Sequence, residues 1–343
     1  MDITVRIATF NSENLFSRVL LLNKEGAERE ELEKATIKEL QEQGMVRVGR
    51  VRKKGTGSEW FRFTRQPINE IGQHNTARVI DAVNADVICL QEVEDLETLR
   101  LFNEHVLKPV QDKNADRDKP NLKYYSSLLL LNGNDQDRYI NVAVMSRLEI
   151  LGIRTHMFDV DDEGLIFRRD CLEVDVMTQS KKKITILISH LKSQIPSYRM
   201  VGSERVNVTP EIRKREIAKI VDILKLKLTN DPNGYIVLAG DLNGDPSYEE
   251  MKRLSEHDVG MINVVTEKLP TNQRWTLVYG TKKYQYDYLL ISQNLKRKLK
   301  SVDIERRGIS RSRTAFSGVR FDTVSRDGTE ASDHCSVSMD IDV

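Results

Sequence analysis

The sequence has few cysteines, almost no net charge and no long apolar run. Its three cysteines, Cys89, Cys171 and Cys335, are odd in number and lie in apolar stretches without metal-ligand spacing, which favours buried thiols over a disulfide framework. The 53 basic and 52 acidic residues leave a formal net charge of +1, so any attraction to nucleic acid must come from a local basic surface. No apolar run approaches the length of a membrane span, and no leader precedes the first strand-like run, Ile3 to Ile7. We therefore expect a soluble, cytoplasmic protein, or a secreted one if a leader has been removed.

The 343 residues contain no fixed-period repeat and no low-complexity tract. Short runs rich in β-branched residues alternate with polar connections and a few helical stretches, which predicts an α/β fold that we assign to one domain over residues 1–343. The strand-like runs are Val87 to Leu90, Asn141 to Met145, Ile184 to Ile188, Tyr235 to Ala239, Tyr288 to Ile291 and Ser336 to Ile341. The predicted helices are Glu25 to Gln43, Asn75 to Val83, Leu96 to Leu107, Thr209 to Lys227 and Ser247 to Leu254.

A charged insertion is predicted at about residues 18–70. Its first half is an amphipathic helix, and its second half, Met45 to Gln66, alternates like a hairpin around Gly55-Thr56-Gly57. This hairpin carries Trp60 and one acid, Glu59. Its basic residues are Arg47, Arg50, Arg52, Lys53, Lys54, Arg62 and Arg65.

Polar clusters stand at the ends of the predicted strands, where a rigid scaffold can hold side chains over a cleft. They are FNSEN at residues 10–14, LQEVED at 90–95, SHLKS at 189–193, GDLNGDP at 240–246 and SDH at 332–334, with Asp287 in YDYLLIS. Each cluster taken singly is more often a turn, a cap or a hydrogen-bonded histidine. Together they supply the different groups that phosphodiester hydrolysis needs.

Hydrolysis of a phosphodiester requires an in-line water and stabilisation of charge on the phosphate oxygens. Carboxylates such as Glu92 suit a hard cation, Mg²⁺ or Mn²⁺, with open water positions. A histidine held by a carboxylate, such as His334 with Asp287, can take the proton of the water at neutral pH. Asn11 and His190 can donate hydrogen bonds to phosphate without adding negative charge.

The sequence resembles the endonuclease/exonuclease/phosphatase superfamily, the group of deoxyribonuclease I, apurinic endonucleases, neutral sphingomyelinases and inositol polyphosphate 5-phosphatases. The matching motifs are ATFNSENLF, VICLQEVED, NVAVMSR, ISHLKS, VLAGDLNGDP, YDYLLIS and ASDHCSV, in family order from residue 8 to residue 337. The resemblance implies a four-layer α/β sandwich, with two packed mixed β-sheets flanked by helices.

On the metal side, the resemblance implies that Glu92 is the main ligand and that Glu13 stands where some members have a further acidic ligand. Asp333 matches an acid on the metal side, and Asn11 matches an asparagine that contacts phosphate or the metal shell. Asp241 matches an acid that positions the water or binds a second metal.

On the proton-transfer side, His334 matches the histidine treated as the general base, oriented by Asp287. His190 matches the histidine that stabilises the transition state or assists the leaving group. Asn243 matches an asparagine that contacts the phosphate or the metal shell, beside Asp241.

Enzymes with different substrates share these catalytic residues, so the substrate must be inferred from other features of the sequence. Basic side chains beside aromatic rings favour a nucleic acid, and a solvated charged surface is the alternative. The candidate contacts are Arg52, Lys53 and Trp60 in the insertion, Arg311 and Arg313 in the basic segment from Asn294 to Arg320, and Arg138 and Arg169.

Differences from the motifs of two subfamilies argue against an apurinic endonuclease and against a sphingomyelinase. Val93-Glu94 and Phe10 replace the lysine and tryptophan typical of apurinic endonucleases, and no apolar lipid-binding loop is evident. LQEVED, HLKS and DLNGDPSY are closer to deoxyribonuclease I-like bacterial nucleases.

The leading hypothesis is a Mg²⁺-dependent nuclease that cleaves DNA, with RNA as an alternative substrate, and that has nucleic acid as its partner and no obligatory protein partner. A phosphodiesterase or phosphatase acting on lipid headgroups, inositol phosphates or nucleotides is the second hypothesis. A binding module without turnover is the third, and the intact set of catalytic residues argues against it.

Overall fold

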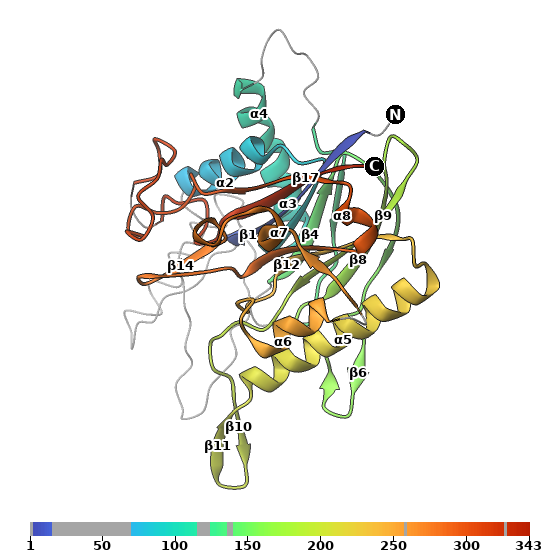
Figure 1. Cartoon of the computed structure of the whole chain (residues 1–343). Coiled ribbons are helices and arrows are strands. Elements are labelled where there is room, and N and C mark those ends of the chain that lie inside the picture. Colours follow the sequence, from blue (N-terminus) through green and yellow to red (C-terminus); the bar gives the residue numbers. More distant parts are fainter. Residues whose placement is uncertain (1–2, 16–69, 115–123, 136–139, 257–258, 326–327) are drawn as a thin grey trace, which may run out of the picture.

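Two six-stranded mixed sheets form the centre of the molecule (Figure 1). The computed structural model describes residues 3–15, 70–114, 124–135, 140–256, 259–325 and 328–343. The first sheet has the order β17-β18-β1-β2-β4-β3. Its strands are β1 (Thr4–Leu15), β2 (Val87–Val93), β3 (Ser127–Leu130), β4 (Asn141–Ser146), β17 (Leu299–Glu305) and β18 (Ser336–Asp342).

The second sheet has the order β13-β16-β12-β9-β8-β5. Its strands are β5 (Glu149–Arg154), β8 (Cys171–Met177), β9 (Lys183–His190), β12 (Tyr235–Asp241), β13 (Ile262–Asn263) and β16 (Asp287–Ile291). One pair in each sheet is parallel, β1 with β2 and β9 with β12, and the other pairs are antiparallel.

Alternate side chains of each central strand enter different cores. In β12, Val237 and Ala239 join the core between the sheets, whereas Ile236 and Leu238 join the core beneath the outer helices. Strands that are apolar on both faces, such as Val87 to Leu90, need cover on both sides.

Helices provide that cover. α2 (Glu70–Val83), α3 (Leu96–Phe102), the π-helical turn η1 (Asn103–Leu107) and α4 (Lys108–Asn114) lie on the side of the first sheet. α5 (Thr209–Asn230), α6 (Glu249–Lys252) and the 3₁₀ turn η2 (Arg253–Ser255) lie on the second. α7 (Val264–Lys268) and α8 (Gln293–Lys296) contribute to the core between the sheets, and the 3₁₀ turn η3 (Thr271–Gln273) follows α7. The predicted four-layer α/β sandwich is confirmed.

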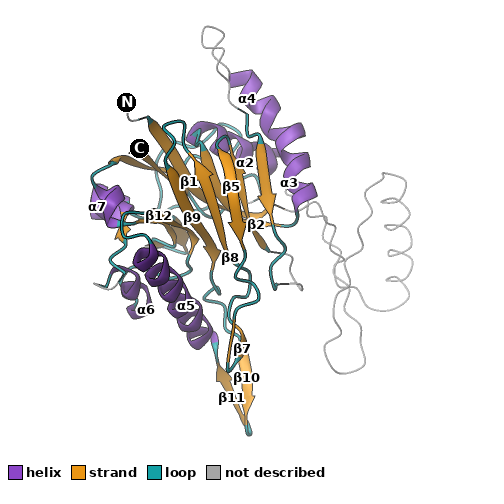
Figure 2. Cartoon of the chain, turned by 90° about the vertical axis from the view of Figure 1, so that its right-hand side faces the viewer, coloured by secondary structure: helices purple, strands orange, loops and turns teal. Residues whose placement is uncertain are grey.

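Three short hairpins complete the described chain: β6 (Val160–Asp161) with β7 (Gly164–Leu165), β10 (Tyr198–Val201) with β11 (Glu204–Asn207), and β14 (Leu277–Tyr279) with β15 (Lys282–Tyr284). The first two project together from one end of the sandwich (Figure 2).

The predicted helices and strands differ from the structure mainly at their ends and in what was missed. The helix predicted from Asn75 begins at Glu70, and the one predicted from Leu96 to Leu107 changes to a π turn after Phe102 and continues to Asn114. The sequence pattern did not indicate β3, β5, β8, β13 or β17 of the two sheets, nor the strands of the three short hairpins. The predicted insertion at about residues 18–70, apart from its final residue, lies outside the described residues.

Two further expectations concern burial. All three cysteines are buried and free, as predicted. Within the described residues, no helix combines the length and the apolar character needed to cross a membrane.

Candidate active site

The inward-facing sides of neighbouring strands end in polar residues at the same edge of the sandwich. In β9, the inward series Ile184, Ile186, Ile188 ends at His190. The register of the second sheet places Asp241 of β12 between His190 of β9 and Asp287 of β16. The core between the sheets therefore gives way at this edge to a cluster of functional groups.

The backbone at this edge adopts conformations that few residues tolerate. Gly240 has φ of 144°, and a Cβ there would lie 1.8 Å from the carbonyl oxygen of Ser189, so only glycine fits between β9 and β12. Glu13, Glu92 and Asn243 have φ of 47°, 62° and 50°. Positive φ at non-glycine residues carries a conformational cost that often accompanies functional sites.

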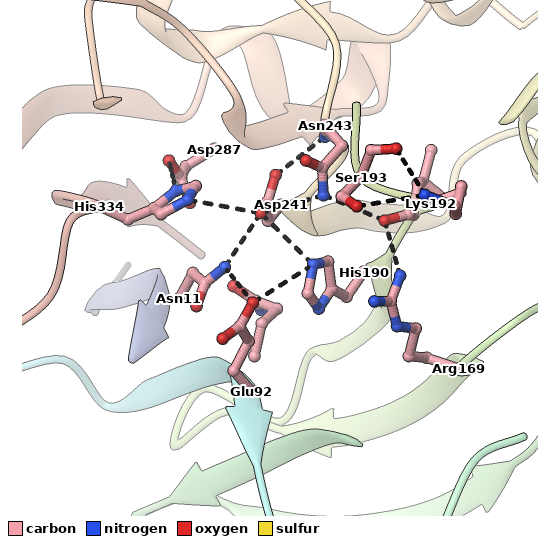
Figure 3. A network of polar contacts seen from close by, with 12 residues as sticks. Asn11, Glu92, Arg169, His190, Lys192, Ser193, Asp241, Asn243, Asp287 and His334 are labelled. Carbon is pink, nitrogen blue, oxygen red and sulfur yellow. Dashed lines mark hydrogen bonds and ion pairs between the residues drawn. The ribbon is translucent and has the colours of Figure 1, made fainter. Parts of the chain in front are cut away.

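His334 and Asp287 form a hydrogen-bonded pair (Figure 3). His334 Nδ1 lies 2.9 Å from Asp287 Oδ2, and Asp287 is fully buried. Thr276 supports the pair, because its hydroxyl accepts a hydrogen bond from the Asp287 amide and its carbonyl accepts one from the Cys335 amide. With its proton on Nδ1 facing the carboxylate, the imidazole presents Nε2 to Asp241, whose Oδ2 is 3.7 Å away.

Asp241 is the centre of the cluster. Its Oδ2 accepts a hydrogen bond from Asn11 Nδ2 at 3.0 Å and one from Asn243 Nδ2 at 3.2 Å, and it lies 3.5 Å from His190 Nε2. Its Oδ1 accepts a bond from the Asn243 amide. Donors from three separate chain segments thus converge on one carboxylate (Figure 3).

An acidic group lies on the other side of Asn11. Glu13 Oε2 accepts a hydrogen bond from the Asp333 amide at 2.8 Å, and Glu92 Oε1 lies 3.5 Å from Asn11 Nδ2 and 3.9 Å from His190 Nε2. Burial and the neighbouring Asp333 carboxylate raise the pKa of Glu13 to about 8. Burial and the Asp333 carboxylate also raise the pKa of Glu92, whereas the positive charges of His334 and Arg169 lower it. These carboxylates therefore repel one another when all are ionised.

The same electrostatics act on the central residues. Burial raises the pKa of Asp241 to about 7, although the charge of His334 opposes the rise. Burial also disfavours the charged form of His334, but the carboxylates of Asp287, Asp241 and Asp333 outweigh it and raise the pKa of His334 well above its ordinary value. The imidazole is charged at neutral pH for as long as these three carboxylates are uncompensated.

The residues fit a hard divalent cation. Glu92, Glu13 and Asp333 offer carboxylate oxygens, the ligand type that Mg²⁺ and Mn²⁺ prefer, and their mutual repulsion is a charge imbalance that a cation would relieve. Among the described residues, the tightest group of possible ligands is Asp241, Asp287 and His334, whose ligand atoms lie within 4.8 Å of one another. Its short Nδ1 to carboxylate contact is that of a hydrogen-bonded pair, so the carboxylates around Glu92 are the better candidate ligands for a cation.

A buried network supports the segment after His190. Glu216 of α5, fully buried, accepts hydrogen bonds from the amides of Lys192 at 2.8 Å and Arg168 at 3.1 Å. Arg169 Nη1 and Asn243 Nδ2 both donate to the carbonyl of Leu191 at 3.0 Å. Three elements therefore fix the position of this segment.

The sequence did not indicate Glu216. A usable signal was present, because Glu216 falls with Arg213 and Ile220 on the helical face that α5 buries. A charged residue at such a position needs internal partners.

The predicted substrate contacts are not all at this site. Arg169 was predicted to meet substrate, but only 1% of its side chain is exposed and it pairs with Asp135 at 3.1 Å. Its position allows a supporting role and not direct contact. Arg311 donates from Nε to the Val324 carbonyl, and Arg313 is half-buried; within the described residues, neither contacts the cluster.

Intramolecular contacts account for much of the basic segment from Asn294 to Arg320. Lys296 pairs with Glu267, and Arg320 donates to several backbone carbonyls. The remaining predicted contacts, Arg52, Lys53, Trp60 and Arg138, lie outside the described residues.

Comparison with protein families matches residues 69–334 to the model of the endonuclease/exonuclease/phosphatase family. Comparison with curated protein sequences gives no significant match.

Solved structures with a similar fold include D. rerio TDP2 complexed with a single-strand DNA product, at a TM-score of 0.52 and 15% identity over 100% of each chain. Another is an endonuclease/exonuclease/phosphatase family protein from Bacteroides thetaiotaomicron, at 0.54 and 12% over 99% of this chain and 98% of that one. A third is truncated Caenorhabditis elegans TDP2, at 0.53 and 17% over 80% and 91%. At these identities the likeness concerns the fold.

Proposed function

The chain belongs to the endonuclease/exonuclease/phosphatase family, whose members hydrolyse phosphate esters, and we propose that it is a Mg²⁺-dependent nuclease that cleaves DNA by direct attack of water. The observation that carries the proposal is the convergence, at one edge of the sandwich, of the His334–Asp287 pair, the donors around Asp241 and the acidic group at Glu92. Each part serves a different need of the reaction.

The His334–Asp287 pair is suited to proton transfer. His334 takes the proton of the attacking water at Nε2, while Asp287 holds Nδ1 and stabilises the imidazolium that forms. The water oxygen bonds to phosphorus, and the bond to the leaving sugar oxygen breaks. The alkoxide released then takes up a proton.

The remaining residues bind charge. Asn11, Asn243 and His190 can donate hydrogen bonds to phosphate oxygens from positions that now converge on Asp241. Glu92, Glu13 and Asp333 would hold the cation, which when bound supplies charge neutralisation at the phosphate. Asp333 is also one of the carboxylates that raise the pKa of His334, so a cation bound at Asp333 would lower that pKa.

DNA is the first substrate to test, since the D. rerio TDP2 structure of similar fold holds a single-strand DNA product. Plasmid and single-stranded DNA should be cleaved in Mg²⁺ and not in EDTA. His334→Ala should abolish cleavage, and His105→Ala, an exposed histidine on η1, should leave it intact. Faster turnover of inositol phosphates, nucleotides or lipid headgroups than of DNA would support the second hypothesis instead. If the unmutated protein cleaves no DNA, the proposed nuclease function is refuted.

A further inference from the structure

The β10–β11 hairpin is joined directly to the site. β9 ends at His190, and the hairpin begins at Tyr198 after a short connection. Its base is closed by the bond from the Val208 amide to the Ser197 carbonyl and by the bond from the Ser197 amide to the Thr209 hydroxyl. The hairpin is therefore a fixed extension of the strand that carries His190.

The two faces of the hairpin differ. Arg199 on one face pairs with Glu163 of the β6–β7 hairpin at 2.6 Å. On the other face lie Tyr198 and Met200, with exposed fractions of 50% and 61%, and Arg205, which is paired with Met200 in the register. The Arg205 guanidinium carbon stands 3.9 Å from the centroid of the Tyr198 ring. This face therefore presents an aromatic ring, a thioether and a cation to solvent.

Arg168 is a further exposed cation near the segment after His190. Its amide and the amide of Lys192 bond the two oxygens of the same buried carboxylate, Glu216, which brings exposed Arg168 beside the segment after His190. Within the described residues, the Arg168 side chain makes no hydrogen bond or ion pair. A solvent-facing cation thus stands beside the segment that leads from His190 to the hairpin, and a ring stacked by a cation stands on the hairpin itself.

We propose that Arg168 and the Tyr198–Met200–Arg205 face form a track for an unpaired stretch of nucleic acid that flanks the scissile phosphate. Cations along the track neutralise phosphates, and a base stacks on the exposed part of the Tyr198 ring, whose attraction for bases does not depend on sequence. A duplex hides the faces of its bases, so the track selects a single-stranded segment. This inference rests on the proposed function and adds the form of the substrate.

Continuity with the site favours nucleic acid over a lipid surface as the occupant, because the hairpin follows directly from the strand that carries His190. The cations of the track attract anionic lipid as well as nucleic acid and do not separate the two. A lipid surface is accordingly the alternative for the experiment to exclude.

The test compares Tyr198→Ala/Arg205→Ala with the unmutated full chain on two substrates in Mg²⁺. One is a single-stranded DNA of about 16 nucleotides, long enough to occupy such a track. The other is bis-p-nitrophenyl phosphate, a diester without the nucleotide chain needed to extend from the site onto the track. We expect KM for the oligonucleotide to rise about tenfold, with little change in kcat or in hydrolysis of the small diester.

The matched control is Tyr124→Ala/Lys108→Ala, which removes another aromatic–cation pair from the opposite end of the sandwich and should change neither substrate. Equal losses on both substrates, no loss on the oligonucleotide, or the same loss in the control would overturn the track. The track would also be overturned if the unmutated protein binds phosphatidylserine vesicles and the Tyr198→Ala/Arg205→Ala variant does not, while the KM of the variant for DNA stays unchanged. If the unmutated protein cleaves no DNA, the proposed function fails, whereas active unmutated protein with an equally active variant refutes the track alone.

Discussion

Asp287→Asn isolates the contribution of one charge to the reaction. The substitution keeps the shape of a fully buried side chain but removes the carboxylate that lies 2.9 Å from His334 Nδ1. Two unit charges at that distance attract by roughly 6 kcal/mol at an effective dielectric of about 20. The change should therefore lower the pKa of His334 substantially.

The variant should also lose rate. The amide nitrogen that the substitution introduces can donate to Nδ1 of His334 and so favour the tautomer with its proton on Nε2, the atom that must accept the proton of water. We expect kcat to fall about 10³- to 10⁴-fold, the loss seen for the equivalent change in a Ser-His-Asp triad. In the unmutated protein we expect activity to rise with pH as His334 loses its proton, so the acidic limb of the profile should move to lower pH in the variant.

The assay is the pH dependence of kcat/KM for DNA cleavage in saturating Mg²⁺. Asp86→Asn serves as the control, because Asp86 accepts a hydrogen bond from the Arg6 amide at the opposite end of the first sheet. A variant whose kcat stays within about threefold of the unmutated value, with the acidic limb unmoved, would refute the role assigned to the pair.

Three further outcomes follow from the site. Folded Glu13, whose pKa is raised from 4.5 to about 8, retains a proton that the unfolded chain releases. The metal-free protein should therefore lose stability as the pH rises from about 5 to 8. Calorimetry should show a smaller loss of stability when Mg²⁺ is present and a smaller loss in the Glu13→Gln variant. Gly240→Ala should cost more than about 4 kcal/mol of unfolding free energy, because the added Cβ would strike the Ser189 carbonyl. Gly280→Ala is the control: Gly280 has φ of 59° but open space around it, so its substitution should cost about 1–2 kcal/mol. Equal costs for the two variants would contradict the packing argument. Glu216→Gln weakens the support of the segment after His190 and should lower kcat about tenfold with KM unchanged; a fall in melting temperature without any kinetic change would assign Glu216 to stability alone.

Part of this arrangement is visible in the sequence for local reasons. A strand places alternate residues on one face, so a run such as Ile184, Ile186, Ile188 indicates both a buried face and the side on which His190 will lie. Gly240 before Asp241 is equally local, because the close strand pairing there admits no side chain. The prediction of Glu92 and Asp241 depended on such positions at strand ends.

Other features depend on partners that are distant in the chain. Arg169 follows a polar connection and resembles a surface cation in the sequence, yet its pairing with Asp135 and Leu191 makes it internal. The exposed Tyr198 resembles a strand residue of a core, but it belongs to a two-stranded hairpin that pairs with no further strand among the described residues. Burial of one side chain is set by neighbours that the local pattern does not contain.

The sequence by itself indicated an α/β fold, because β-branched runs and helical stretches are local patterns, and its resemblance to a family indicated the four-layer sandwich and the roles of the polar residues at the strand ends. The tertiary structure decided which groups meet. His334 reaches Asp287 across 47 positions, and Asn11 reaches Asp241 across 230, because strand register and sheet packing bring their segments together. That packing also decided the electrostatics: only when Glu13, Glu92 and Asp333 share one partly desolvated volume do their charges oppose one another and favour a cation.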